Sequence, residues 1–170
     1  MLTKNYYNVF AVLSTGINMS NGGVSTSSGR KQNIYHHNST LTALNFYAGT
    51  SNVLTAVTDI GIVFGDGTTE PTIDDHKLSG NIITNISKIG DSYSYKVTSD
   101  GYVCTKTVII KNTGTESITV GEVGWISLVN SGNNTTFYAL LDRTLLDSPV
   151  VIPAGKSAQI DYSVCLNFGA

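Results

Sequence analysis

The residues of this chain whose types and spacing could support chemistry are few, and the densest group is acidic. Asp66, Glu70, Asp74 and Asp75 all fall in the segment 66–75, which also holds a glycine and a proline. Carboxylate oxygens on such a loop are ligands that Ca²⁺ prefers. The spacing does not follow the alternate positions of an EF-hand loop, so we expect a turn at Asp66 and an aspartate pair that caps the residues after it. Calcium binding by this loop stays an open alternative.

A second candidate is formed by two charged residues that stand alone in apolar surroundings. Glu122 lies in one apolar run and Arg143 in the next. Both runs have the composition of strands, so we expect Glu122 and Arg143 to form an ion pair across adjacent strands. A glycosidase site would need two acids that converge from separate strands. No pattern brings Glu122 together with the acids of segment 66–75.

Other arrangements for catalysis or metal binding are not found in the sequence. There is no Gly-x-Ser-x-Gly elbow, Walker loop, dinucleotide fingerprint or His-Glu-x-x-His helix. His36 and His37 are adjacent, and neighbouring side chains on a strand face opposite ways, so we expect a surface pair. We therefore predict a protein that is not an enzyme, with no catalytic, cofactor-binding or metal-binding residues and no cofactor.

The two cysteines, Cys104 and Cys165, are too few for a disulfide framework and lack metal-ligand spacing. We expect two free thiols on or under strands. Neither cysteine lies near a histidine in the sequence, which gives no support for a nucleophile with a base.

The elements that must position these residues begin with an N-terminal arm. Leu2, Tyr6, Val9, Phe10 and Leu13 fall at helical spacing, which predicts a short amphipathic helix, with an extended arm as the alternative. Residues 18–40 are rich in Asn, Gly and Ser, which predicts a long polar loop. We take residues 1–40 as this arm and loop, and residues 41–170 as one β-sandwich domain.

From residue 41 onward the chain has the pattern of short strands separated by turns. Asp100 and Gly101 between two alternating runs predict a hairpin, and a polar loop at 131–134 predicts another. The predicted strands are 41–46, 53–64, 78–89, 92–97, 103–111, 118–129, 137–141, 150–152 and 158–167. The fold class predicted is all-β, an antiparallel β-sandwich of jelly-roll-like form.

Charge and hydropathy argue against two classes of partner. Charged residues are only 13% of the chain, about half the usual share of roughly 25%, and the formal net charge is −2. Such a chain has no basic field for nucleic acid. No apolar run approaches the roughly 20 residues needed to span a bilayer. We expect no nucleic-acid and no membrane partner.

Segment 64–80, FGDGTTEPTIDDHKLSG, has the pattern G-[TD]-G-T-T-x-P-[ST]. The patterns T-x-N-[FY]-[YF], V-x-E-[IV]-G and R-x-x-L-x-x-P occur in LTKNYY at 2–7, TVGEVG at 119–124 and LDRTLLDSPVVIPAG at 141–155. Taken in order, these four segments resemble small structural proteins of tailed bacteriophages and prophages, including decoration, head-fibre and tail-associated proteins. The match spans most of the chain.

This resemblance implies a virion component with a β-sandwich core and no catalytic residues. The expected partners are other virion proteins, from capsid or tail, and sister subunits in a homo-oligomer such as a trimer. The expected location is the virion, after assembly in the bacterial host cytoplasm. We expect residues 1–40 to make the contacts outside the sandwich, because a short apolar stripe needs a partner, and the alternative is that the stripe docks on its own sandwich.

An alternative from another class is a carbohydrate-binding, lectin-like module of a phage fibre. Exposed aromatic side chains could stack on sugar rings, although tyrosines on strands are often packed and half-buried. The candidates are Tyr35, Tyr47, Tyr93, Tyr95 and Tyr138. A hydrolase, the third possibility, would need converging acids or a triad that the sequence does not contain.

Overall fold

The computed structural model describes residues 1–15, 19–34, 61–99, 101–130 and 136–167. This part of the chain is mostly β-strand in antiparallel sheets, which confirms the all-β prediction. In chain order the elements are α1 (Lys4–Thr15), β1 (Met19–Ser25), β2 (Lys31–Ile34), β3 (Gly61–Gly65), β4 (Ile86–Val97), β5 (Gly101–Asn112), β6 (Ile118–Asn130), β7 (Thr136–Ile152) and β8 (Ser157–Asn167).

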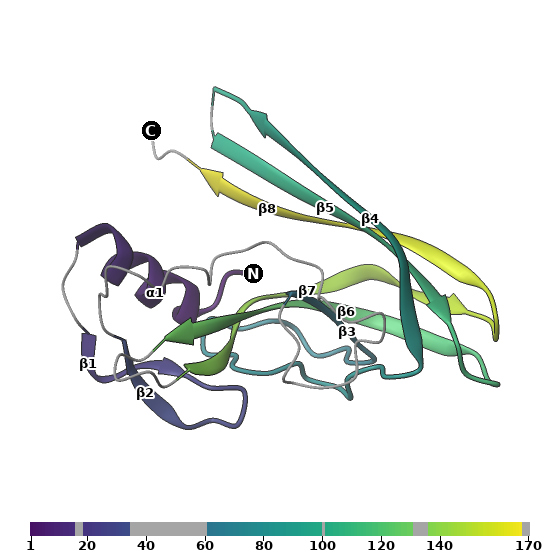
Figure 1. The fold of residues 1–170 in the computed structure, drawn as a ribbon, viewed down its shortest axis with the longest axis horizontal. Coiled ribbons are helices and arrows are strands. Elements are labelled where there is room, and N and C mark those ends of the chain that lie inside the picture. The colour runs from purple at the N-terminus through teal and green to yellow at the C-terminus, as the bar shows by residue number, and fades with distance from the viewer. Residues whose placement is uncertain (16–18, 35–60, 100, 131–135, 168–170) are drawn as a thin grey trace.

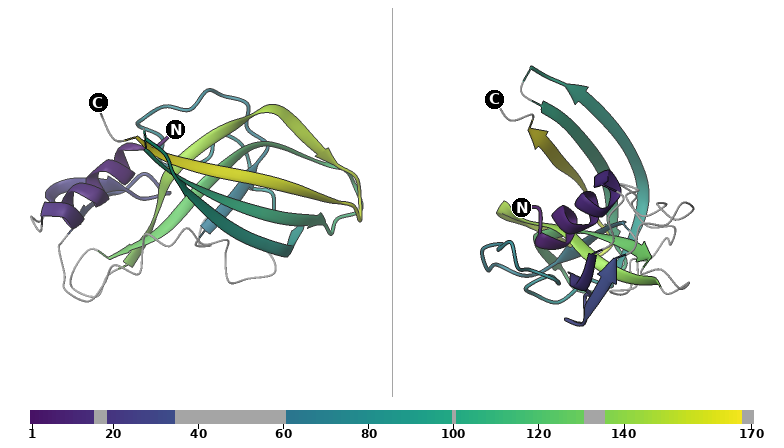
Figure 2. Two further views of the ribbon diagram at one scale, coloured as in Figure 1. Left: turned by 90° about the horizontal axis from the view of Figure 1, so that it is seen from above. Right: turned by 90° about the vertical axis from the view of Figure 1, so that its left-hand side faces the viewer.

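Within the described ranges, the strands form two three-stranded sheets and one small two-stranded sheet. The strand orders are β3-β6-β7, β4-β5-β8 and β1-β2. The two larger sheets form layers that approach each other at one end and spread apart toward the other, beside α1 (Figure 1). The right-hand view of Figure 2 shows the same spreading of β4, β5 and β8 away from the second layer.

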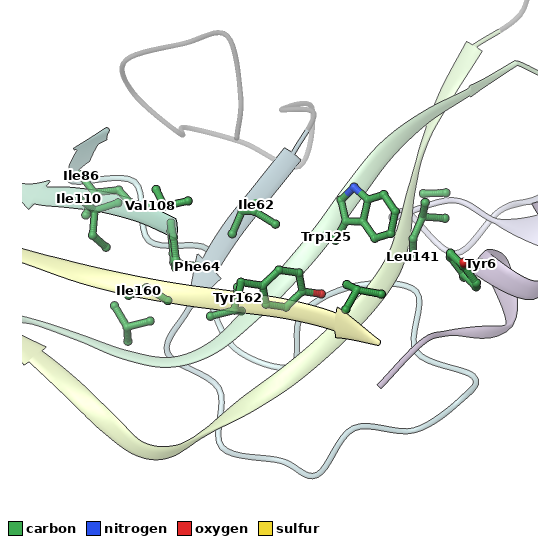
Figure 3. Packing of buried hydrophobic residues seen from close by; sticks show 14 of the residues in the cluster. Tyr6, Ile62, Phe64, Ile86, Val108, Ile110, Trp125, Leu141, Ile160 and Tyr162 are labelled. Carbon is green, nitrogen blue, oxygen red and sulfur yellow. The ribbon is translucent and has the colours of Figure 1, made fainter. Parts of the chain in front are cut away.

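One hydrophobic core joins the two larger sheets. Phe64 of β3 and Val120 of β6 belong to the same cluster as Val108 of β5 and Ile160 of β8. Figure 3 shows this packing, with Trp125 and Tyr6 at the end nearer α1. Alternation along each strand explains the cluster, because every second side chain of a strand points to the same face.

The strand pairings of both predicted hairpins are present, whereas Asp100 and the predicted loop 131–134 lie outside the described residues. β4 pairs with β5 in antiparallel register from Ile86↔Asn112 to Val97↔Tyr102, and β6 pairs with β7. The predicted strands 137–141 and 150–152 are parts of the single strand β7. The predicted alternation of the last strand is confirmed, since Ile160, Tyr162 and Val164 are buried between exposed neighbours.

The N-terminal segment is the helix that the spacing predicts, but its inner side docks on its own domain. The hydroxyl of Thr3 donates to the carbonyl of Leu140 at 2.8 Å, and Tyr6 is only 6% exposed. The prediction that this stripe makes contacts outside the domain is therefore wrong for its first turns. Tyr7 and Phe10, on the helix surface, remain 52% and 50% exposed.

The predicted polar loop at 18–40 is also corrected. Its described part contains the antiparallel pair β1–β2, in which Val24 is 1% exposed. The side chain of Asn5 accepts from the Ser25 backbone N–H at 2.7 Å and donates to the Ser25 carbonyl at 2.7 Å. These two hydrogen bonds hold the end of β1, a strand whose composition alone does not favour β structure.

The predicted strand 78–89 is correct only in its second part. β4 begins at Ile86, and before it only an isolated bridge, Gly65↔Ile82, resembles strand pairing. Residues 41–46, 53–60 and the His36–His37 pair lie outside the described residues. No helix in the described part of the chain is long and apolar enough to cross a membrane.

Candidate functional site

The predicted ion pair between Glu122 and Arg143 is confirmed, and it belongs to a larger buried cluster. Arg143 Nε donates to Glu122 Oε2 at 2.6 Å, from adjacent strands β7 and β6. A second guanidinium nitrogen, Nη1, donates to Asp75 at 2.6 Å, and the third, Nη2, to the carbonyl of Thr69. Arg143 is 2% exposed and Glu122 is fully buried. We call these residues, with Ser79 and Gly80, the ion cluster.

The Glu122 carboxylate also holds the backbone of the loop that covers it. The backbone N–H of Gly80 donates to Glu122 Oε1 at 2.7 Å, and that of Ser79 to Oε2 at 3.2 Å. Gly67 lies so close that a Cβ atom there would be 2.1 Å from Glu122 Oε1. Only a glycine fits at this position, because the Cβ atom of any other residue would displace the Glu122 carboxylate.

The charges of the ion cluster stabilise one another. Burial lowers the pKa of Arg143, but its hydrogen bonds with Glu122 and Asp75 outweigh burial and raise it above its ordinary value. Burial raises the pKa of Asp75, but hydrogen bonds from Thr72 and Arg143 hold it below its ordinary value. Arg143 and Asp75 are therefore charged at neutral pH. Every carboxylate here accepts hydrogen bonds from the protein, so the ion cluster fastens loop to sheet instead of presenting a free acid.

The acidic segment 66–75 is likewise engaged with the protein. Asp66 accepts from the backbone of Asn81 at 2.6 Å, and Asp74 pairs with Lys4 at 2.8 Å. Asp75 accepts from the backbone N–H of Thr72, so it caps residues before it, not after it as predicted. Within the described ranges, no group of three or more Asp, Glu, His or Cys side chains could hold a metal ion.

A second candidate lies at the spread end of the sheet β4-β5-β8. Tyr93 and Tyr95 of β4 stand opposite Lys106 and Cys104 of β5. Alternation along β5 puts these positions on the face that carries Val108 into the core. Where the layers have spread apart, this face lacks the second sheet over it (Figure 1).

Here the aromatic side chains line a hollow. Tyr93, Tyr95, Tyr102 and Cys104 surround a cavity of about 260 Å³, which we call the tyrosine hollow. Tyr93 is 73% exposed and Tyr95 is 67% exposed. The rings of Tyr95 and Tyr102 stack with centroids 6.0 Å apart. Burial raises the pKa of the Cys104 thiol, which makes it a poor nucleophile.

The two cysteines lie on opposite faces of this sheet. Cys104 is opposite Val164, whereas Cys165 is opposite Val103, one position along. Directly opposed residues share a face and successive residues alternate, so the two thiols point away from each other. This geometry agrees with the expectation of free thiols.

Sequence reasoning found part of each region and missed the rest. It paired Glu122 with Arg143 but assigned Asp75 to a local cap, because no spacing rule links a loop to a distant strand. It named Tyr93 and Tyr95 as exposed aromatics, and both are exposed. Tyr138 is half-buried, and Tyr35 and Tyr47 fall outside the described residues. Tyr102 completes the hollow and is absent from the predicted aromatic residues. The register of the predicted Asp-Gly hairpin is the signal that could have placed it beside Tyr95.

Comparison with known proteins does not assign this chain to a family. A scan against models of protein families, a search of curated proteins and a search of solved structures each gave no match.

Proposed function

We propose that this chain is a structural component of a bacteriophage virion, a capsid decoration or other head- or tail-associated accessory protein. It acts by binding the particle and sister subunits, and not as an enzyme. The single observation that supports this proposal is that the four segments resembling phage structural proteins come together in space.

Three of these segments meet at the ion cluster. Arg143 belongs to segment 141–155, Glu122 to segment 119–124 and Asp75 to segment 64–80. Charged side chains from separate parts of the sequence thus meet with hydrogen-bonding geometry in a buried place, where a mismatch would be costly. A resemblance caused by chance composition gives no reason for its pieces to be in contact.

The fourth segment, at the N-terminus, joins the same unit. The backbone N–H of Thr3 donates to the carbonyl of Leu141 at 2.9 Å, and that of Lys4 donates to the carbonyl of Ile73 at 2.7 Å. Residues 2–7 therefore lie against both segment 141–155 and segment 64–80. This contact pattern is what a shared fold would require of segments that occur together.

The proposal includes the finer form of the fold and its partners. The two three-stranded layers and their common core fit a β-sandwich of jelly-roll-like form. A homo-oligomer, such as a trimer, fits the exposed rings of Tyr7 and Phe10, because large apolar side chains that gather on a surface favour association. The weakly charged composition limits the desolvation cost of such contacts.

The decisive experiment is quantitative mass spectrometry of purified phage particles produced by a host that carries this gene. We expect the chain in gradient-purified particles, at a fixed ratio to the major capsid protein. A non-structural protein encoded by the same genome serves as the control and should be depleted. Particles that contain every other structural protein but not this chain would refute the proposal.

A further inference from the structure

We propose that the tyrosine hollow binds an uncharged glycan, with one sugar ring packed on Tyr93 and Tyr95. This goes beyond a role in particle structure and does not depend on it. Tyr93 and Tyr95 lie on the same face of β4, since they are two residues apart on one strand. Both rings are open to solvent, and both border the same cavity of about 260 Å³.

The rings are held in place before any ligand arrives. Tyr95 stacks on Tyr102 of the neighbouring strand, with an angle of 18° between the ring planes. The ammonium group of Lys106 lies 5.9 Å from the centroid of the Tyr93 ring, within the range of a cation–π contact. A preorganised site loses less conformational entropy on binding than one that must be ordered by its ligand.

The cation beside the hollow is already paired. Lys106 is buried, and its ammonium group is bonded to Asp91. Lys88 lies 3.5 Å from the same carboxylate, so two ammonium groups share one acid and this group of three residues keeps a net charge of +1. A carboxylate or phosphate on the ligand would have to displace Asp91 to pair with the buried Lys106. An acidic sugar, a nucleotide and a single-stranded nucleic acid therefore gain no direct ion pair with Lys106, whereas a neutral glycan needs none.

A sugar ring has the surface that this hollow complements. One face of a hexose carries C–H groups that pack flat on an aromatic ring, while its hydroxyls point outward and exchange hydrogen bonds with tyrosine hydroxyls. Small-molecule sites are typically about 300–1,000 Å³ and are lined by aromatic side chains with a few polar groups. A hollow of about 260 Å³ lies just below this range, which suits one or two sugar units.

The test is a glycan-array screen of the full chain, followed by titration of the best neutral glycan by isothermal calorimetry. Four single variants are compared with the unaltered chain: Tyr93→Ala, Tyr95→Ala, Tyr95→Phe and Tyr7→Ala. We expect binding of neutral glycans in preference to acidic ones. Each alanine variant of the hollow should weaken that binding at least about tenfold, which is about 1.4 kcal/mol.

The remaining two variants separate the hollow from general aromatic adhesion. Tyr95→Phe keeps the ring and should lose less affinity than Tyr95→Ala. Tyr7 is exposed on α1, outside the hollow, so Tyr7→Ala should bind as the unaltered chain does. Urea unfolding of each variant verifies that a loss of binding is not a loss of fold.

The competing occupant of this face is a second copy of the chain, and sedimentation velocity decides between them. If no neutral glycan binds at millimolar concentration, the proposal is wrong. It is equally wrong if the chain self-associates and Tyr95→Ala makes it monomeric without any glycan binding. Equal loss of binding in Tyr7→Ala and Tyr95→Ala would also contradict it.

Discussion

At the ion cluster, Glu122 and Arg143 are almost completely buried, whereas at the tyrosine hollow Tyr93 and Tyr95 are more than half exposed. The first region places charges where apolar residues usually lie, and the second places aromatic rings in water. Buried charges are tolerated only when they are paired and hydrogen-bonded, and all those of the ion cluster are. Among the described residues, no contact of this kind accounts for the exposed aromatic rings of the tyrosine hollow, which is why we assign them to ligand binding.

This difference indicates how the molecule divides structure from recognition. The ion cluster joins strands β6 and β7 to the loop that covers them, and Gly67 packs closely against the Glu122 carboxylate. A substitution in this region should therefore affect folding. The tyrosine hollow lies on the paired strands β4 and β5, and the rings of Tyr93 and Tyr95 are mostly exposed. Substitutions in the first region should therefore lower stability, and substitutions in the second should leave stability nearly unchanged.

The largest expected effect is that of Arg143→Ala. Removal of the guanidinium leaves Glu122 and Asp75 as close, partly or fully buried carboxylates without their cation. We expect the free energy of unfolding to fall by about 3–5 kcal/mol, as measured by urea denaturation. Lys96→Ala, at an exposed position on β4, should change it by less than about 0.5 kcal/mol. An unchanged melting temperature for Arg143→Ala would contradict the importance of the ion cluster.

A smaller effect is expected for Gly67→Ala. The new Cβ would lie 2.1 Å from both Glu122 Oε1 and Ser79 Oγ, so the carboxylate must move away from its donors. We expect a loss of about 1–3 kcal/mol in the free energy of unfolding. Gly114→Ala is the matched control, because its nearest neighbouring atoms would be 3.3 Å away. Equal losses in the two variants would show that the close approach at Gly67 is unimportant.

The free energy of unfolding should fall as the pH is lowered, and protonation of Asp75 should account for part of that dependence. The pKa of Asp75 is lower in the folded chain than its ordinary value of 3.8, so the unfolded chain takes up its proton first. The stabilisation from Asp75 is therefore complete above that value and is lost as the pH falls through the folded pKa. We expect Asp75→Asn to be less stable at pH 7 and to lose less additional stability between pH 5 and pH 3. A slope identical to that of the unaltered chain would exclude this role.

The smallest expected effect is that of the double variant Tyr93→Ala/Tyr95→Ala on stability. Both side chains are mostly exposed, so little buried area is lost. We expect a change of less than about 1 kcal/mol, since surface substitutions rarely exceed about 0.5 kcal/mol each. Circular dichroism during thermal unfolding measures it. Unfolding of this variant would show that the rings pack against part of the chain, and the contrast between the two regions would fail.

Parts of the fold were predictable because their cause is local. The β4–β5 hairpin follows from alternation around Asp100 and Gly101, and the turn into β8 from Pro153 to Gly155, where Gly155 has a φ of 69°. Such left-handed backbone suits glycine, which has no Cβ to clash. These signals lie within a few residues of the structure that they determine.

The remaining errors come from partners that are distant in sequence. β1 is a strand because Asn5 bonds to the backbone of Ser25 and because Val24 is buried, and neither fact shows in the local pattern. The apolar residues of segment 78–85 predict a strand that the structure does not form. Glu122 instead holds the backbone of Ser79 and Gly80, which would otherwise be free for a ladder. Long-range hydrogen bonds of this kind cannot be inferred from spacing.

The measurement that most directly tests the division between the two regions is native-state hydrogen exchange of backbone amides. Ser79 and Gly80 lie outside any strand, yet both amides donate to the buried Glu122 carboxylate. We predict that these two amides exchange only through global unfolding, like those of β6. Amides of residues 91–97 in the edge strand β4 should exchange through smaller local openings. Rapid exchange at Ser79 and Gly80, together with slow exchange along residues 91–97, would contradict the assignment of stability to the ion cluster and of recognition to the tyrosine hollow.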